Sequence, residues 1–216
     1  MTPVMDAYRD YSAGEQYDVV RYSGAMGRFR LWQQRRAVAW AVERISPGSS
    51  ILDCPCGTGR IWWQLQRRGL LVTGTDVSPG MIRHARERSE QHGGSVAVVE
   101  ADATSLPFAD ASFDWVFSFA LTKHLDPPTQ YRVLAEFGRV ARVGVICTFG
   151  LLNHVTYELW RRRHAEWVAS GTAESIPLWR EELEWMGNAA GLWLHESRRC
   201  TTPVGVEHLC VLRSRR

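Results

Sequence analysis

Three acidic residues in the first half of the chain follow short apolar runs that are typical of buried strands. They are Asp53, Asp76 and Asp102. A charge at the end of a buried strand is costly unless it meets a polar partner. Strands of a parallel sheet end at one edge, so we expect the three carboxylates to face a single polar ligand.

A turn rich in glycine follows the first of these carboxylates. The window 51–60 reads ILDCPCGTGR, and its Gly57 and Gly59 permit a tight bend and the close approach of a ligand. Asp76 stands 76 − 59 = 17 residues after the last glycine. An acceptor for ribose hydroxyls is expected about 20 residues on. The spacing therefore predicts a ligand that contains a ribose.

The charges favour one such ligand over another. A dinucleotide carries two phosphates, which three carboxylates would repel. A ligand with a ribose, an adenine amine and a free ammonium would be attracted instead. S-adenosylmethionine has all three groups, so we predict it as the cofactor.

The elements that must position these residues alternate between strand and helix. Strands are expected at 50–54, 70–76, 96–100, 113–119, 143–149, 192–199 and 207–213, and helices at 28–45, 60–68, 79–92, 128–140, 154–170 and 178–190. This order predicts a doubly wound α/β fold with a mostly parallel seven-stranded sheet, a Rossmann-like arrangement. The short connection before the last strand predicts that this strand is antiparallel.

The length of 216 residues fits one domain with a small addition. We expect residues 1–45 to form a flap and a helix over the active site. Residues 46–216 would form the catalytic domain, with an insertion at about 151–177 that builds the substrate pocket.

From about Ser49 onward the chain resembles the class I S-adenosylmethionine-dependent methyltransferases, closest to their small-molecule branch. The stretch Asp53–Gly59 is similar to the first motif of the family, D-x-G-x-G-x-G, although Pro55 replaces its first glycine. The stretches 74–81, 101–103 and 113–119 resemble the next three motifs. The resemblance implies the following cofactor-binding residues: Asp53, Cys54, Pro55, Cys56, Gly57, Gly59, Asp76, Val77, Met81, Asp102, Ala103 and Ser118.

The resemblance also implies a role for each motif. The glycine turn would line the methionyl part of the cofactor, with Asp53 near its ammonium group. Asp76 would bind the ribose, with Val77 and Met81 beside the adenine. Asp102 would accept from the adenine amine, with Ala103 beside the ring. The end of the fourth strand would reach the methyl group.

A general base is needed only if the acceptor must lose a proton. His124 lies in the loop after the fourth strand and is the first candidate, because an imidazole titrates near pH 6.5. Lys123, the only lysine of the chain, is the second. A packed structural histidine is the alternative reading for His124.

Aromatic residues could build the acceptor pocket. The candidates are Tyr17 and Tyr22 in the flap and His154 and Tyr157 after the fifth strand. We expect methyl transfer to an oxygen or nitrogen atom of a small aromatic or heterocyclic acceptor.

Other function classes remain open at this stage. An RNA or protein methyltransferase would show a continuous arginine-rich surface. An NAD-dependent oxidoreductase and a non-catalytic cofactor-binding module are further alternatives. We expect no metal, because Cys54 and Cys56 lack a nearby histidine at ligand spacing.

The composition bears on partners and compartment. The net charge of +3 is spread along the chain, which argues against nucleic acid as a partner. No uncharged apolar stretch of 18 residues suggests a membrane span, and no basic start with an apolar run suggests a signal peptide. Five unpaired-looking cysteines fit a reducing cytoplasm. We expect a monomer or a homodimer.

Overall fold

The computed structural model describes residues 23–92, 94, 96–170, 176–200 and 205–215. The helices of this part are α3 (Gly24–Val42), α4 (Trp62–Arg67), α5 (Pro79–Gln91), the 3₁₀ helix η1 (Thr122–His124), α6 (Pro127–Val140), α7 (His154–Ser170) and α8 (Arg180–Ala189). The strands are β1 (Ser50–Asp53), β2 (Leu71–Asp76), β3 (Ala97–Glu100), β4 (Phe113–Ser118), β5 (Ala141–Leu152), β6 (Leu178–Trp179), β7 (Leu192–Arg199) and β8 (Glu207–Ser214). Tyr17 and Tyr22 lie outside the described residues.

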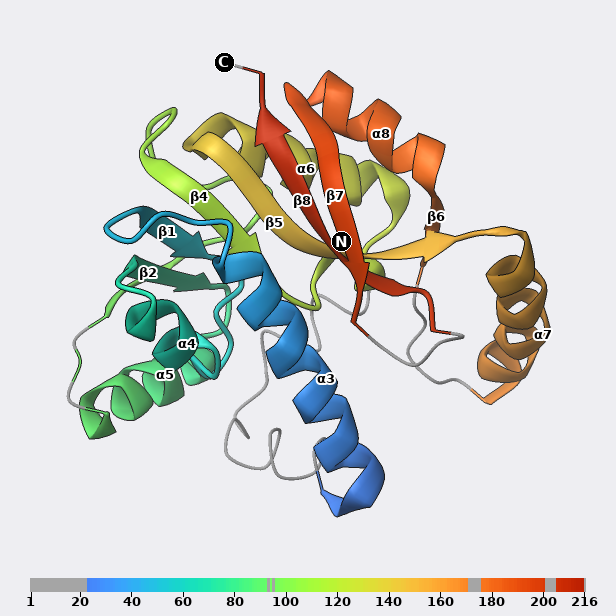
Figure 1. Cartoon of the computed structure of the whole chain (residues 1–216), viewed down its shortest axis with the longest axis horizontal. Coiled ribbons are helices and arrows are strands. Elements are labelled where there is room, and N and C mark those ends of the chain that lie inside the picture. Colours follow the sequence, from blue (N-terminus) through green and yellow to red (C-terminus); the bar gives the residue numbers. More distant parts are fainter. Residues whose placement is uncertain (1–22, 93, 95, 171–175, 201–204, 216) are drawn as a thin grey trace.

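The strands form one sheet in the order β3-β2-β1-β4-β5-β8-β7 (Figure 1). Strands β1 to β5 pair in parallel, and β8 is antiparallel to both of its neighbours, β5 and β7. The prediction of a mostly parallel seven-stranded sheet with an antiparallel last strand is confirmed. The two-residue strand β6, which pairs with the end of β5, is an eighth strand that the sequence pattern did not reveal.

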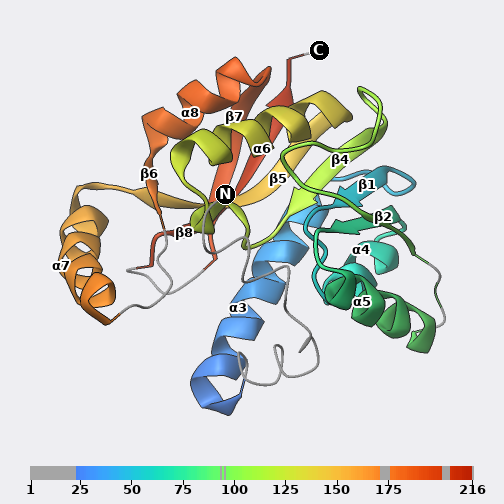
Figure 2. The same cartoon turned by 180° about the vertical axis from the view of Figure 1, so that it is seen from behind.

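Helices cover both faces of the sheet, and each face has its own apolar core. One core joins residues of α6 and α8 to the sheet, as the view from behind shows (Figure 2). The other joins α3, α4 and α5 to the opposite face. Within α3, Ala37, Val38 and Ala41 are buried in this second core.

The boundaries differ from the prediction most clearly at three places. Residues 178 and 179, which were predicted to begin a helix, form strand β6, and α8 begins only at Arg180. Helix α3 runs from Gly24 to Val42, so it begins earlier and ends earlier than the 28–45 expected, although Ile45 is buried as expected. Strand β5 begins at Ala141, directly after α6. Val143 and Gly144, which begin the predicted strand 143–149, are therefore the third and fourth residues of β5. A Cβ on Gly144 would lie 2.3 Å from the carbonyl oxygen of Leu212, so the residue lets β8 approach closely.

Two helices begin where a side chain caps their first turn. Ser78 Oγ accepts from the N–H of Met81 at 3.4 Å, and Asp126 Oδ1 accepts from the N–H of Thr129 at 2.9 Å. A proline at the start of each helix fits the same position. Ser78 lies two residues beyond the carboxyl end of β2, and Asp126 follows η1 in the connection after β4, so both caps help to shape the edge where ligands bind.

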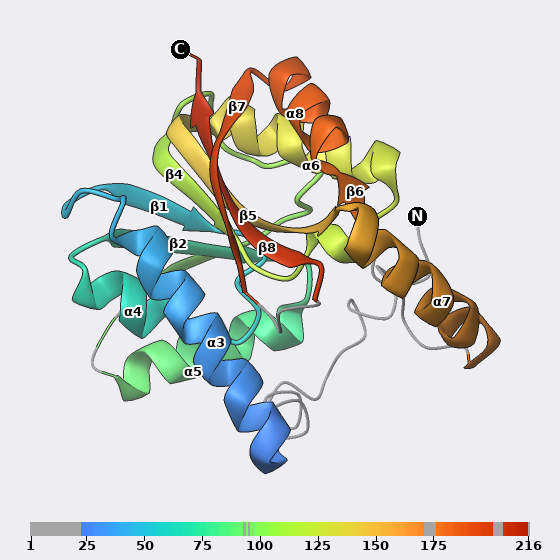
Figure 3. The ribbon, with the colours of Figure 1, turned by 45° about the vertical axis from the view of Figure 1, so that its right-hand side comes forward.

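Helices α3 and α7 project from the body of the protein at that edge (Figure 3). Within the described part of the chain, no helix is both long enough and apolar enough to cross a bilayer.

Candidate active site

Asp76 is the residue that organises the glycine turn. It ends β2 and is buried, with only 6% of its surface exposed. Its Oδ2 accepts from the N–H of Gly57 at 2.9 Å, and its Oδ1 accepts from the N–H of Ser78 at 3.0 Å. Burial raises the pKa of Asp76, while these two backbone N–H groups and that of Val77 oppose the rise. The carboxylate thus ties the loop after β1 to the loop after β2.

Both glycines of the turn have left-handed backbone angles. Gly57 has a φ of 52° and Gly59 a φ of 68°. Only glycine adopts this region without strain, which is what the motif predicts. The Cys54–Pro55 peptide bond is cis. Pro55 stands at the position where the motif resembled in the sequence has its first glycine.

Asp53 is held by a partner that the sequence pattern did not reveal. The indole N–H of Trp62 donates to Asp53 Oδ2 at 2.8 Å, and both residues are buried. Burial raises the pKa of Asp53 to about 8, the indole hydrogen bond lowers it, and the nearby charge of Asp76 raises it. Asp53 is therefore a carboxyl group that gains or loses a proton near neutral pH.

This raised pKa gives a testable dependence of stability on pH. The folded pKa of about 8 lies above the ordinary value of 3.8, so between these pH values the folded chain holds a proton that the unfolded chain has released. The contribution to stability is complete below about pH 4 and is lost as the pH rises through about 8. Asp53→Asn stays neutral at every pH and keeps an acceptor for the Trp62 indole.

We expect Asp53→Asn to become more stable relative to the wild-type chain as the pH rises. Urea unfolding at about pH 5, 7 and 9 measures the free energy of unfolding of both chains. A difference that stays constant over this range would show that Asp53 does not titrate in it.

Asp102 has a local partner as well. Its Oδ1 accepts from the backbone N–H of Thr104 at 2.9 Å and from the Thr104 hydroxyl at 2.8 Å. The side chain is half-buried, and the neighbouring Ala103 packs into the core with 9% exposed. Through its Oδ1, Asp102 therefore stabilises the loop that follows β3.

The parallel register brings the predicted cofactor residues to one edge. Asp76 pairs with Glu100 on β3, and Asp53 lies opposite Gly74 on β2 and Phe117 on β4. Ser118, the last residue of β4, follows one residue later. Val77 is half-buried after β2, and Met81 is 5% exposed in the first turn of α5.

The residues at this edge fit S-adenosylmethionine. The hydroxyl of Ser118 is fully buried and has no hydrogen-bond partner among the described residues, as expected for a group that a ligand would satisfy. At the bend, no atom of the described residues lies within 4 Å of the position that a Cβ on Gly57 would take, so this part of the structure leaves room for a ligand beside the backbone. The edge supplies acidic groups for the ribose and amine groups and no basic side chain from the motif residues.

The two cysteines of the turn point into different cores. The predicted strand 50–54 included Cys54, but β1 ends at Asp53, before either cysteine. Cys54 packs in the core below α6, and Cys56 packs in the core below α4. Burial raises the pKa of both thiols well above the ordinary value, so neither is a thiolate. Within the described ranges, no group of three or more potential metal ligands comes together.

Lys123 lies in an ion pair rather than beside the glycine turn. It is 8% exposed, and its ammonium donates to Glu207 of β8. Its backbone carbonyl accepts from the N–H of Ile176 at 2.7 Å. These contacts favour a structural role, in which Lys123 ties the loop after β4 to β8.

The same loop is tied to α6 and β5. The buried amide of Gln130 donates to the carbonyls of Thr122 at 3.0 Å, Leu125 at 3.1 Å and Ile176 at 3.2 Å. The N–H of Ala120 donates to Thr148 Oγ1 at 2.7 Å. His124, half-buried at the end of η1, is thus held on a well-anchored loop just past Ser118.

His154 and Tyr157 lie further out. Ser118 pairs with Cys147, and β5 continues for 152 − 147 = 5 more residues before α7 begins. At a rise of roughly 3.3 Å per residue, this places α7 about 17 Å along the strand beyond Ser118. The two side chains contact Trp179 instead, with ring centroids 5.7 Å and 5.5 Å away.

Three residues that hold the site together were not predicted from the sequence, and the sequence pattern points to only one of them. Gln130 is polar on the buried face of an amphipathic helix, which marks a side chain that needs partners. Trp62 looked like an ordinary core residue, and Glu207 is distant in sequence from the lysine it pairs with. Their roles depend on tertiary contacts.

Comparison with known proteins gives a consistent family. A family model described as a methyltransferase domain matches residues 51–144. The demethylmenaquinone methyltransferase of Thermobifida fusca is 41% identical over 149 residues, which cover 65% of this chain and 59% of that protein. The protein of the same name from Mycobacterium sp. strain JLS is 32% identical over 189 residues, which cover 79% of this chain and 77% of that protein. The chain thus spans less than two thirds of the Thermobifida relative.

Solved structures agree on the fold. The magnesium protoporphyrin IX methyltransferase of Synechocystis, solved with bound SAH, superposes with a TM-score of 0.78 over 98% of both chains at 15% identity. Such low identity speaks for the fold alone. The shared fold and the sequence relatives together show that the chain belongs to the class I S-adenosylmethionine-dependent methyltransferases, whose cofactor is S-adenosylmethionine.

Proposed function

We propose that the chain transfers a methyl group from S-adenosylmethionine to a small aromatic acceptor of the demethylmenaquinone kind. The main support is the hydrogen bond from the N–H of Gly57 to Asp76 Oδ2. It holds the residue proposed to bind the ribose beside the glycine turn. The names of the sequence relatives support the acceptor class.

The proposed roles follow from the site. S-adenosylmethionine, when bound, supplies a methyl group on a positively charged sulfur. Asp76 would hold the ribose hydroxyls, and Asp53 would face the ammonium end through the oxygen that Trp62 does not occupy. Ser118 would lie near the methyl end, where its buried hydroxyl gains a partner. Holding the reacting groups in line accounts for roughly 7 to 11 kcal/mol of the barrier in such reactions.

His124 is proposed as the group that takes a proton from the acceptor. It lies on the loop after β4, and the ties from Gln130 and Thr148 fix that loop. Lys123 is a weaker candidate for this role, because Glu207 already engages its ammonium. Tyr17, Tyr22, His154 and Tyr157 remain proposed acceptor contacts.

We expect His124→Ala to lower turnover about 10²-fold or more and to leave cofactor affinity unchanged. His195→Ala removes an exposed histidine on β7 and serves as the control. An unchanged rate in His124→Ala would mean that another residue takes the proton, or that the methylated substrate needs no general base.

Transfer of a labelled methyl group to candidate acceptors tests the proposal itself. Reduced naphthoquinones, phenols and heterocyclic amines are compared with RNA and with protein. Mass spectrometry of the product locates the methylated atom. The sequence predicts an oxygen or nitrogen atom, whereas a quinone-type acceptor could also be methylated on carbon. Labelling of RNA or protein alone would contradict a small-molecule acceptor, and labelling of nothing would favour a module that only binds the cofactor.

A further inference from the structure

Helix α3 carries an exposed apolar stripe on the half that projects from the body of the protein (Figure 3). The stripe consists of Met26, Phe29 and Trp32, which are 68%, 46% and 50% exposed. A spacing of three residues places them on one side of the helix, while the buried Gly27 and Gln34 lie on the other. Large apolar side chains gathered on one exposed face mark a surface that meets a partner.

Arginines surround the stripe. Four arginines of α3 are exposed, namely Arg28, Arg30, Arg35 and Arg36, and the helix contains no aspartate or glutamate. At 3.6 residues per turn, Arg28 and Arg30 flank the stripe, one on each side. Among the described residues, none of the four forms an ion pair with an acidic side chain. The projecting half of α3 is therefore both apolar and positively charged.

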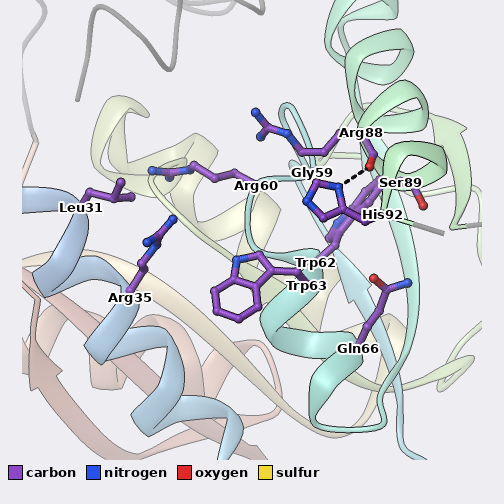
Figure 4. Close-up of a pocket in the computed structure, with 10 residues that line it drawn as sticks. All are labelled: Leu31, Arg35, Gly59, Arg60, Trp62, Trp63, Gln66, Arg88, Ser89 and His92. Atoms are coloured by element: carbon purple, nitrogen blue, oxygen red, sulfur yellow. Dashed lines mark hydrogen bonds between the residues drawn. The ribbon is translucent and has the colours of Figure 1, made fainter. Parts of the chain in front are cut away.

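The same combination continues from α3 onto α4. Arg35 and Trp63 line a common pocket between the two helices (Figure 4), and the guanidinium of Arg35 lies 6.0 Å from the ring centre of Trp63. The guanidinium of Arg67 lies 5.7 Å from the same ring, and that of Arg36 lies 4.7 Å from the ring centre of Trp32. Contact with a ring orients a guanidinium and leaves its N–H groups available to an anion.

We propose that this face of α3 docks on the surface of a bilayer that contains anionic lipids. A helix that lies in the interface places tryptophan, phenylalanine and other apolar side chains at the boundary of headgroups and acyl chains. Arginines beside them extend their charged ends to the lipid phosphates. The stripe supplies the apolar contact, and a helix with four arginines and no acid supplies the charge complementarity. Such a helix lies on the membrane, so it needs neither the length nor the composition of a span.

Two other occupants fit this face less well. A second copy of the chain, docked on the same face by two-fold symmetry, would bring the arginines close to their own equivalents, and α3 has no acidic residue to pair with them. A nucleic acid would use the arginines and stack its bases on the rings, but Met26 has no ring. A bilayer surface uses the whole stripe.

Co-sedimentation of the full chain with vesicles tests the proposal. One set of vesicles contains equal amounts of phosphatidylcholine and phosphatidylglycerol, and the other contains phosphatidylcholine alone. We expect the chain to bind the anionic vesicles about tenfold or more tightly than the neutral ones, and to bind them less tightly as the salt concentration rises.

Trp32→Ser should weaken binding to the anionic vesicles about tenfold or more, since it removes a large apolar side chain from the interface. Trp185→Ser is the matched control. Trp185 is 68% exposed on α8, whose exposed residues include the acidic Glu181, Glu182 and Glu184. This variant should bind as the wild-type chain does.

A second pair of variants tests the charge. Arg28→Gln/Arg30→Gln should also weaken binding about tenfold or more, because each arginine near an anionic surface adds to the attraction. Arg83→Gln/Arg86→Gln removes two exposed arginines of α5, so it changes the net charge equally and should bind nearly as the wild-type chain does. All the exchanged side chains are exposed, so we expect each variant to keep the fold, which urea unfolding checks.

The proposal would be overturned by a lack of binding to the anionic vesicles, by equal binding to the neutral ones, or by equal weakening in a variant and its control. Tighter binding of a single-stranded oligonucleotide, lost in Trp32→Ser, would show a nucleic-acid surface instead. Self-association without vesicles that Trp32→Ser abolishes would show a contact between copies. The assay contains neither cofactor nor methyl acceptor, so its outcome is independent of the proposed function.

Discussion

Asp76→Ala is expected to weaken the binding of S-adenosylmethionine about 10³-fold. The change removes the proposed acceptor for the ribose hydroxyls, and a hydrogen bond to a charged group contributes about 1.5 to 3 kcal/mol. It also leaves the N–H groups of Gly57 and Ser78 without their acceptor, so the glycine turn loses its tie to β2. Each unsatisfied N–H costs about 1 to 3 kcal/mol if water does not reach it. The two losses act on the same turn.

Asp76→Asn separates the two contributions. The amide keeps one oxygen acceptor, so one backbone N–H stays satisfied and the other faces an NH₂ group. We expect an intermediate loss of affinity and a smaller loss of stability. Titration calorimetry gives the affinity, and urea unfolding gives the stability.

Glu100→Gln is the matched control, because Glu100 ends the neighbouring strand β3 and is exposed. It should leave both quantities nearly unchanged. If Asp76→Ala bound the cofactor as tightly as Glu100→Gln, the carboxylate at the end of β2 would have no part in binding.

Gly59→Ala is expected to destabilise the fold by about 3 kcal/mol or more and to weaken the cofactor site with it. Two separate costs add at this position. The φ of 68° is one that alanine adopts only with a strain of about 1 to 2 kcal/mol. A Cβ there would also lie 2.8 Å from the ring of Trp62. This ring cannot move freely, because it is buried and its N–H is hydrogen-bonded to Asp53. Overpacking of this kind costs about 1 to 3 kcal/mol.

Gly48→Ala isolates the first of these costs. Gly48 has a φ of 83°, and a Cβ there would have no atom within 4 Å. We expect Gly48→Ala to cost only the strain, about 1 to 2 kcal/mol, as measured by urea unfolding. Equal destabilisation by the two substitutions would mean that Trp62 does not constrain the turn.

Much of the fold was predictable because its signals are local. The alternation of short apolar runs with amphipathic helices predicts the parallel sheet, and Ser78 and Asp126 mark the helix starts. The start of β5 was predicted two residues too late, because Ala141 directly follows α6 and only its pairing with Phe113 of β4 makes it part of the strand. Strand β6 is too short to carry a periodic signal.

The candidate site also contains residues that the sequence predicts and contacts that it does not. Asp76 and the glycine turn follow from spacing, since the strand ends alone bring them together. The partner of Asp53 does not, because the side chain of Trp62 turns back across the loop to reach it. The pair of Lys123 with Glu207 joins residues 84 positions apart, a contact that only the arrangement of β8 beside β5 creates.

The proposed function requires that the carboxyl edge of β1, β2 and β4 binds S-adenosylmethionine. Thermal unfolding of the chain in the presence of S-adenosylmethionine, S-adenosylhomocysteine and NAD, side by side, tests this most directly. Both sulfur-containing ligands should raise the melting temperature, by an amount that grows with ligand concentration, and NAD should not. No shift with either of them, or a larger shift with NAD, would contradict the assignment.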